Sequence, residues 1–202
     1  MTGAMEPLPR SFYESCDVVD LARALVGKIV VHQSPSGLAA GRIVETEAYR
    51  GPEDLAAHSA GGRRTARTEA MFGRAGTAYM FVLYGRSWAF NIVAGAVDTP
   101  HAVLVRAIEP TAGADLIASR RGMPATRVAV SNGPGKLCAA LGLDRSHYGV
   151  DLVSGSLFLV DGPSSAVGRS PRINIDYAGA WAKKPWRFFE RGNRFVSVRP
   201  RE

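Results

Sequence analysis

The feature that most constrains this fold is a succession of strand patterns separated by short turns. Apolar and β-branched residues alternate with polar ones in short runs, and Gly, Pro and Ser stand between the runs. The runs lie at residues 28–33, 38–49, 77–84, 88–94, 101–110, 156–162 and 172–178, and we expect the last to be an edge strand. Strands joined by short turns pair antiparallel, which predicts an α+β (mixed α/β) protein with a mainly antiparallel, curved or open-barrel-like sheet.

Helical patterns flank these strands. Residues 11–27 have apolar residues at helical spacing, with Ser15 or Asp17 as N-cap and Gly27 at the end. Shorter helices are predicted within 111–122 and 131–143, and residues 60–76 are predicted to be mostly loop. The chain contains no repeat, low-complexity tract or linker, so we expect one domain over residues 1–202, with residues 1–10 as a loosely ordered tail.

The charge distribution favours a polyanionic partner. The formal net charge is +7, and residues 181–202 hold seven basic side chains against two acidic ones. Two tryptophans and three phenylalanines lie among these charges, which predicts a packed element with a basic face rather than a solvated tail. Lys183, Lys184 and Arg187 are therefore candidate contacts to a phosphate backbone.

Cysteine and histidine usage bears on compartment and metal binding. Two cysteines are too few for a disulfide framework, and the sequence has neither a signal-peptide pattern nor a membrane-spanning run. We expect a cytoplasmic protein, associated with the nucleoid in a bacterium, or a nuclear one in a eukaryote, with no membrane partner. The four histidines form no ligand spacing, so no metal and no cofactor are expected.

Two acids share one face of the strand predicted over residues 38–49. Side chains two apart on a strand point the same way, so Glu45 and Glu47 lie with Ile43 and Tyr49. Because burying a carboxylate without a partner is costly, the pair indicates a functional site. General acid/base hydrolysis is one interpretation and a retaining glycosidase is another. His58 follows the adjacent turn and can donate a hydrogen bond into the same cavity.

Three further features fit nucleic-acid binding. Tyr84 lies at a hairpin tip beside Arg86, where an aromatic side chain can enter a DNA groove and unstack bases. Asn91 is a polar residue in an apolar strand, which indicates a site wall. The segment SNGPGKL lacks the Walker pattern, yet its glycine turn and Lys136 can meet a phosphate; an ordinary helix N-terminus explains it equally well.

Six segments in order resemble the alkyladenine (3-methyladenine) DNA glycosylase family. They are GRIVETEAYRGPEDLAAHSAGGRRTART, MFGRAGTAYMFVLYG, NIVAG, VLVRAIEP, NGPGKLCAALG and AWAKKPWRF, and the likeness runs from about Ser11 to Val198. The resemblance implies a single-domain enzyme that flips alkylated or deaminated purines, such as 3-methyladenine or hypoxanthine, out of double-stranded DNA. It then hydrolyses the N-glycosidic bond, which starts base excision repair.

The resemblance also implies roles for individual residues. Glu47 is the general base and Arg106 helps to hold its water, with the backbone carbonyl of Ile175 as a third contact. Tyr49 and His58 pack on and hydrogen-bond the extruded base, Asn91 screens out guanine-type amino groups, and Tyr84 intercalates. Family members often have tyrosine where this chain has Phe81, so stacking is retained but a hydroxyl is lost.

The remaining expectations concern reaction type. The resemblance provides no lysine as an amine nucleophile, so we expect a monofunctional, monomeric glycosylase that does not cleave the strand. Glu45 is expected to meet a basic side chain rather than take part in the chemistry. The rival interpretations are a DNA-binding module without catalysis and, more distantly, a glycosidase acting on free sugars.

Overall fold

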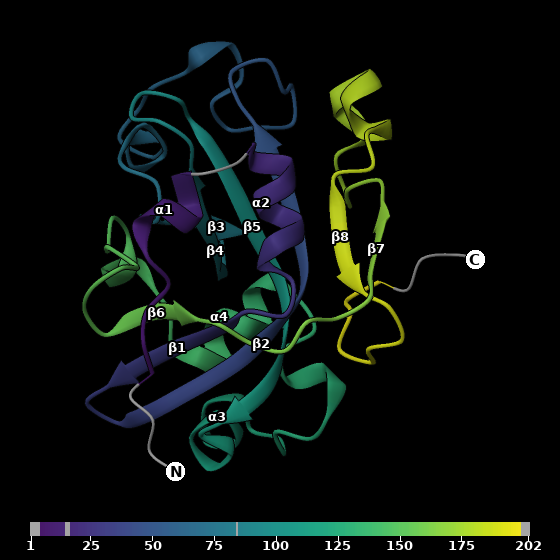
Figure 1. Cartoon of the computed structure of the whole chain (residues 1–202). Coiled ribbons are helices and arrows are strands. Elements are labelled where there is room, and N and C mark those ends of the chain that lie inside the picture. The colour runs from purple at the N-terminus through teal and green to yellow at the C-terminus, as the bar shows by residue number, and fades with distance from the viewer. Residues whose placement is uncertain (1–4, 15–16, 84, 199–202) are drawn as a thin grey trace.

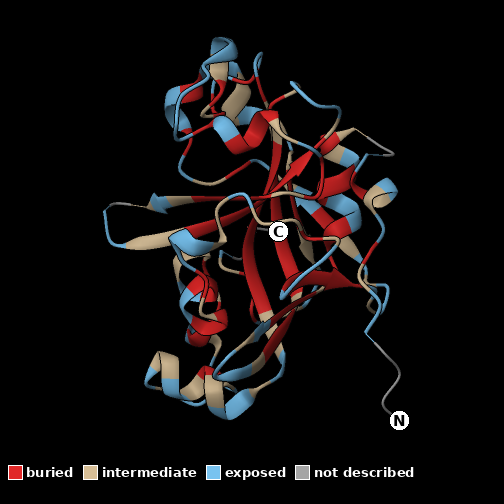
Figure 2. Cartoon of the chain, turned by 90° about the vertical axis from the view of Figure 1, so that its left-hand side faces the viewer, coloured by how far each residue is buried: buried red, intermediate tan, exposed pale blue. Residues whose placement is uncertain are grey.

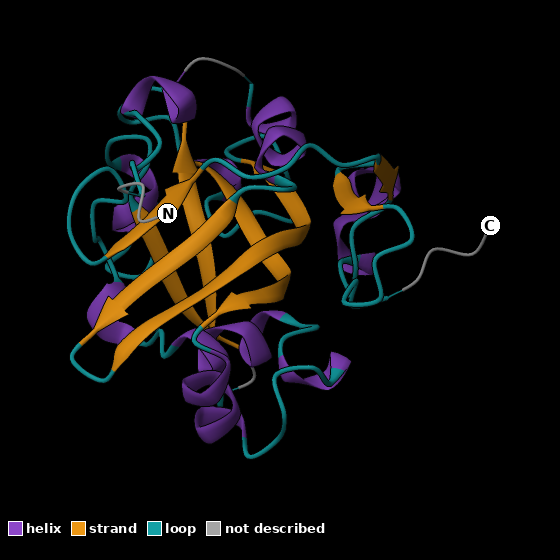
Figure 3. Ribbon diagram, turned by 60° about the horizontal axis from the view of Figure 1, so that its bottom comes forward, coloured by secondary structure: helices purple, strands orange, loops and turns teal. Residues whose placement is uncertain are grey.

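Strand β2 (Gly37–Arg50) runs through the centre of one antiparallel sheet. The computed structural model describes residues 5–14, 17–83 and 85–198. The strand order is β3-β4-β5-β2-β1-β6, and β8 pairs with both β2 and β7 (Figures 1 and 3). The other strands are β1 (Ile29–Ser34), β3 (Ala78–Leu83), β4 (Ser87–Ala94), β5 (His101–Ala112), β6 (Leu157–Val160), β7 (Val167–Ser170) and β8 (Arg187–Glu190). The mainly antiparallel α+β prediction is confirmed.

β2 changes its neighbour along its length. One edge pairs with β5, while the other pairs first with β1 and then, at residues 45–47, with β8. The β2–β5 register shifts at Ile43/Glu45 and at Glu45/Thr46. Such bulges bend a strand and redirect its side chains. The three residues at the bend are consequently enclosed by β5 on one side and β8 on the other.

Helices cover the sheet and complete the core. They are α1 (Arg10–Glu14), α2 (Val18–Leu25), α3 (Ala114–Arg121) and α4 (Pro134–Leu141). Asp17 caps α2 by accepting the Val19 N–H at 2.9 Å, and α2 buries Leu21 and Leu25 against β2 and β5. The largest cluster of buried apolar side chains spans α2, α4 and the central strands (Figure 2). The described residues include no helix of the length and apolar character needed to cross a membrane.

Three local predictions differ from the structure. The single helix expected over 11–27 is two helices, α1 and α2, and residues 15–16 lie outside the described part. Of the predicted N-terminal tail, residues 5–10 are described, and there Leu8 is buried and its N–H donates to the Leu159 carbonyl at 2.7 Å. The edge strand lies at β7, in a predicted loop, rather than at residues 172–178.

Residues 172–178 form an irregular segment leading into the 3-10 helix η5 (Asp176–Lys183). Asn174 has φ 58°, which breaks the extended conformation. The Ile173 N–H donates to a Glu47 carboxylate oxygen instead of to a neighbouring strand. The backbone of this alternating segment therefore bonds to the Glu47 side chain and does not pair with a neighbouring strand.

Candidate active site

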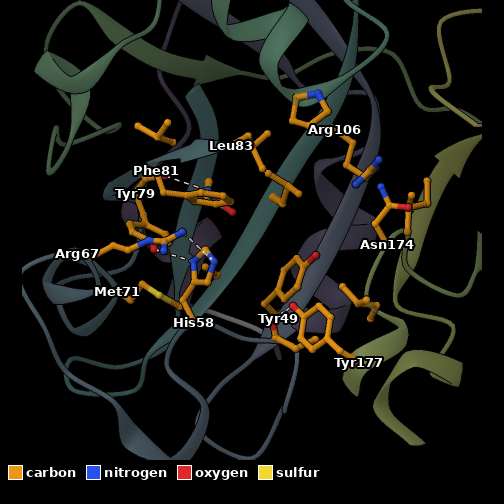
Figure 4. Close-up of a pocket in the computed structure, with 18 residues that line it drawn as sticks. Tyr49, His58, Arg67, Met71, Tyr79, Phe81, Leu83, Arg106, Asn174 and Tyr177 are labelled. Atoms are coloured by element: carbon orange, nitrogen blue, oxygen red, sulfur yellow. Dashed lines mark hydrogen bonds between the residues drawn. The ribbon is translucent and has the colours of Figure 1, made fainter. Parts of the chain in front are cut away.

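A cavity of about 450 Å³ opens where the ends of β2, β3, β4 and β5 meet the segment 173–177. Its wall includes Tyr49, His58, Phe81, Asn91, Arg106 and Ile175, all six of which were predicted to belong to one site. Phe81, Tyr79 and Arg67 lie on one side of it, and Tyr49 and Tyr177 lie on the other (Figure 4). A volume of this size suits a small organic ligand.

Glu47 lies directly behind this wall. Its side chain is fully buried and does not itself line the cavity. Three groups that do line it bind the carboxylate: the Tyr49 hydroxyl donates to Oε2 at 2.9 Å, Arg106 Nη1 donates to Oε2 at 3.2 Å, and the Ile173 N–H donates to Oε1 at 2.8 Å. Glu47 is therefore one layer from the cavity, and the layer consists of its own hydrogen-bond donors.

Burial and hydrogen bonding act on Glu47 in opposite directions. Burial raises the pKa of Glu47, while Arg106, the Ile173 N–H and the Tyr49 hydroxyl lower it, and burial prevails. Of these effects on the pKa of Glu47, the sequence predicts only the one due to Arg106. A carboxyl with a raised pKa is a stronger proton acceptor once ionised, which suits a general base.

Glu45 is a structural neighbour, as expected. It is fully buried and accepts Arg106 Nε at 3.1 Å, Arg187 Nε at 2.6 Å and the Ser197 N–H at 2.6 Å. Burial lowers the pKa of Arg106, and Glu47 and Glu45 more than compensate, so its pKa is raised. Arg106 lines the cavity and holds both acids behind it.

His58 belongs to a chain of hydrogen bonds on the opposite wall. Arg67 Nη2 lies 3.1 Å from His58 Nε2, and His58 Nδ1 lies 2.9 Å from the Tyr79 hydroxyl. A guanidinium can only donate, so Nε2 accepts and Nδ1 carries the hydrogen. Burial, with a contribution from Arg67, lowers the pKa of His58 to about 4, and the ring is neutral at neutral pH.

Asn91 and Phe81 both line the cavity. Asn91 is buried on β4, and its Nδ2 donates to the Tyr79 carbonyl at 3.1 Å, which leaves its side-chain oxygen as an acceptor. The Phe81 ring centroid lies 4.5 Å from that of His58, edge to face.

The segment that carries Ile173 and Ile175 is fastened by a buried ion pair. Arg172 binds Asp54 through two hydrogen bonds of 2.5 and 2.9 Å, and both side chains are fully buried. Arg172 also donates to the Ala48 carbonyl at 2.8 Å, and its guanidinium lies 4.8 Å from the Tyr49 ring centroid. This pair holds the turn after β2 against the segment that binds Glu47.

The position of Arg187 contradicts its predicted contact to a phosphate backbone. It is almost fully buried, with Nε on Glu45 and Nη1 on the Ser170 hydroxyl at 3.0 Å, so it is a partner for Glu45 and not a phosphate contact. Its basic character was visible in the sequence, but the carboxylate that neutralises it lies 142 residues away.

The other predicted phosphate contacts lie at the surface. Arg86 and Lys136 are exposed, and Lys136 Nζ donates to Asn132 Oδ1 at 2.8 Å. Lys183 is exposed on η5, while the Lys184 ammonium lies 4.4 Å from the Trp181 ring centroid. The intercalating role expected of Tyr84 falls outside the described residues.

Sequence reasoning missed several residues of the site. Among the lining residues they include Arg67, Tyr79, Ile173 and Tyr177, and behind the lining they include the Arg172–Asp54 pair. Arg67 lies in a loop with several other arginines, and nothing in the local pattern distinguishes it from them. Ile173 acts through its backbone N–H, which no side-chain pattern can reveal.

Comparison with known proteins identifies the family. The family model described as methylpurine-DNA glycosylase matches residues 11–194. The chain belongs to the methylpurine-DNA glycosylase family. It is accordingly a hydrolase of N-glycosyl bonds, and the resemblance drawn from the six segments is confirmed.

Bacterial relatives match this chain over nearly their whole length. A protein of Desulfitobacterium hafniense is 42% identical over 96% of this chain and 100% of its own. One from Bacillus licheniformis is 44% identical over 98% and 100%, and one from an Anaeromyxobacter species is 46% identical over 96% and 94%. All three carry the provisional name 3-methyladenine DNA glycosylase.

Within residues 5–14, 17–83 and 85–198, no group of three or more His, Cys, Asp or Glu side chains is placed to hold a metal ion. The polar groups of the cavity wall include the Arg67 and Arg106 guanidiniums and the His58 imidazole, and the Glu47 carboxylate lies behind that wall.

Proposed function

We propose that this chain flips damaged purines out of double-stranded DNA and hydrolyses their N-glycosidic bond with a water activated by Glu47. The observation that carries the proposal is the Glu47–Arg106 pair held immediately behind an aromatic cavity. Glu47 takes a proton as the water oxygen bonds to the sugar C1′ carbon. The bond between C1′ and the base nitrogen breaks, and its electron pair leaves with the base.

Access to Glu47 requires a small rearrangement. The Ile173 N–H uses one lone pair of Oε1, which leaves a second for a water molecule, whereas Oε2 already accepts two donors. The Ile175 carbonyl, which lines the cavity, accepts the Ala178 N–H at 2.9 Å and keeps a lone pair for the same water. Seating a base against Tyr49 is expected to move its hydroxyl from Glu47.

The extruded base is expected to stack between Tyr49 and Phe81. Each stacked ring contributes about 1–3 kcal/mol, which offsets the few kcal/mol that unstacking costs. Asn91, whose side-chain oxygen remains an acceptor, is then placed to read the edge of the base. His58 can do so only if the base displaces Arg67 or Tyr79, because these two residues engage both of its ring nitrogens. A cationic alkylated base is already a good leaving group. A neutral deaminated base is a poorer one, so the protein must assist its departure more.

The rim of the cavity is suited to a DNA backbone. Leu83 at the end of β3 and Pro134 at the start of α4 both line the cavity, so the hairpin tip and the helix N-terminus adjoin there. A Cβ on Gly135 would meet Ser87 Cβ at 2.6 Å, which confirms how closely these two elements approach. Arg86 and Lys136 flank this contact and are the rim cations expected to meet phosphate.

We expect the enzyme to be monofunctional. No lysine lines the part of the cavity that the structure describes, so an imine with the sugar has no amine to form it. Borohydride added during the reaction should therefore trap no covalent protein–DNA product. A trapped product would contradict the mechanism with water as nucleophile.

The decisive experiment replaces the proposed base with its isostere. Glu47→Gln should lower single-turnover base release by about 10²–10⁴-fold, while affinity for lesion-containing duplex stays within about threefold of the unmodified protein. Equal losses in release and binding would make Glu47 structural. Glu45→Gln is the matched comparison, and it should reduce the free energy of unfolding because it disturbs Arg106, Arg187 and Ser197 together.

The sequence also left open a DNA-binding module without catalysis, an interpretation that membership of a hydrolase family disfavours. Its one structural support is that the Glu47 side chain is fully buried before a base binds. Incubation with duplexes containing 3-methyladenine or hypoxanthine separates the two functions. Free base in solution supports the glycosylase, whereas retention of the duplex without release supports the binding module.

A further inference from the structure

One wall of the cavity carries a positive charge without a neutralising acid. The Arg67 guanidinium lines the cavity, and within the described residues no carboxylate lies within 4.0 Å of it. The other arginine of the wall, Arg106, is held between Glu45 and Glu47. No aspartate or glutamate belongs to the described part of the lining. A bound base consequently meets an unbalanced cation on this side.

The guanidinium is fixed at the surface on which a base would stack. Arg67 Nη2 donates to His58 Nε2 at 3.1 Å, and the guanidinium carbon lies 5.3 Å from the Phe81 ring centroid. Figure 4 shows Arg67 beside Tyr79 and Phe81 on one side of the cavity. Arg67 therefore occupies a defined place at the aromatic wall, although it comes from an exposed loop.

The same contacts leave hydrogen-bond donors facing the cavity. Because His58 Nδ1 donates to the Tyr79 oxygen, the hydrogen of the Tyr79 hydroxyl is free for another acceptor. The structure gives that hydrogen no acceptor within the described residues. Arg67 itself has five N–H donors, of which one is used on His58 and another on the Tyr79 oxygen, so three remain. This wall thus offers donors and positive charge to whatever enters.

We propose that Arg67 is a base-binding residue that selects neutral damaged purines with acceptor atoms over purines with a formal positive charge. The inference rests on the proposed function, because it concerns the same cavity. A neutral 6-oxopurine such as hypoxanthine offers oxygen and ring nitrogen acceptors to these donors. A cationic purine such as 7-methylguanine in DNA is repelled by Arg67 and competes with it for the face of Phe81.

The test compares two lesions in one duplex sequence. Single-turnover release and affinity are measured for hypoxanthine and for 7-methylguanine, and the ratio between the lesions is the readout. Arg67→Met should lower the hypoxanthine preference by about tenfold, which corresponds to about 1.4 kcal/mol. Arg67→Lys, which keeps the charge, should retain most of the preference. Arg63→Met is the control, because Arg63 is an exposed arginine of the same loop that does not line the cavity.

The possible outcomes distinguish this inference from the proposed function. A ratio that is unchanged in Arg67→Met, or an equal loss on both lesions, would overturn the role of Arg67. An unmodified protein that releases neither base would instead overturn the glycosylase mechanism. If Arg67→Met does not melt cooperatively, Arg67→Gln replaces it, since glutamine lacks the charge but keeps a donor, and the same ratio decides.

Discussion

At the scale of single residues, the Tyr49 hydroxyl is one of three groups that lie between the cavity and Glu47, the proposed general base. Tyr49 donates to Glu47 at 2.9 Å and also presents its ring to the cavity. The tyrosine is therefore expected to have two separable functions. Its ring stacks on the extruded base, and its hydroxyl adjusts the pKa of Glu47. The hydroxyl lowers the pKa of Glu47 against the larger effect of burial.

Tyr49→Phe should move the acid limb of the rate–pH profile to higher pH. Without the hydroxyl, the pKa of Glu47 rises further, so the carboxyl is protonated and inactive over a wider acidic range. Lesion affinity should change little because the ring remains. Single-turnover release between pH 5 and 9 measures the shift.

Tyr177→Phe is the matched control for that experiment. Tyr177 lines the same cavity, but its hydroxyl points to the Ala56 carbonyl at 3.5 Å and not to Glu47. Its acid limb should coincide with that of the unmodified protein. An identical shift in both variants would show that the effect does not pass through Glu47.

At the scale of elements, the site depends on how the end of β2 is attached to the segment before η5. The Arg172–Asp54 pair makes this attachment with both side chains fully buried. Ile173, the next residue, contributes the N–H that binds Glu47. The Arg172–Asp54 pair is therefore expected to support both stability and catalysis.

Arg172→Met should lower the free energy of unfolding by about 3–5 kcal/mol, because it leaves the Asp54 charge buried without a partner. Urea denaturation measures the loss. Asp161→Asn, which breaks the exposed Lys28–Asp161 pair, should cost far less because solvent screens that pair. An equal loss of free energy of unfolding in the two variants would contradict a special role for the buried Arg172–Asp54 pair.

At the scale of the whole molecule, buried and half-buried histidines make stability depend on pH. Burial lowers the pKa of His58 to about 4, and it lowers the pKa of His32 and of His101. The unfolded chain binds protons near pH 6.5, before the folded chain does, so stability is complete above that pH and is lost as pH falls toward the folded pKa values.

The melting temperature should therefore fall between pH 7 and pH 4.5, by about 2–4 °C for each kcal/mol lost. Calorimetry at several pH values measures this decline. His58→Gln should make the decline shallower, since it removes one of the titrating groups. A melting temperature independent of pH over this range would contradict the neutral, buried state of the histidines.

The net charge of +7 predicts strongly salt-dependent DNA binding. The plot of log affinity against log salt should become less steep by about 0.9 when one phosphate contact is removed, as in Arg86→Ala or Lys136→Ala. Lys136→Arg keeps the charge and should keep the slope. Unchanged slopes in both alanine variants would place the phosphate contacts elsewhere on the surface.

The sequence predicted local structure well where neighbouring residues decide it. The hairpin of β3 and β4 and the cap at Asp17 follow from residues a few positions apart. The strand expected at 172–178 was wrong, because Glu47, 126 positions away, takes the backbone N–H that a strand would have used. Arg187 was assigned to phosphate for the same reason, since its partner Glu45 is remote in sequence.

By itself the sequence determined the antiparallel α+β fold, the family and the pairing of two acids on one strand face. These depend on side-chain alternation, turn residues and motif spacing, which are local properties of the chain. Only the tertiary structure decided that Glu45 is neutralised by two arginines while Glu47 lies against the cavity wall, and that Arg67 belongs to that wall. Such contacts depend on strand register and on segments brought together from distant positions, and no local pattern specifies them.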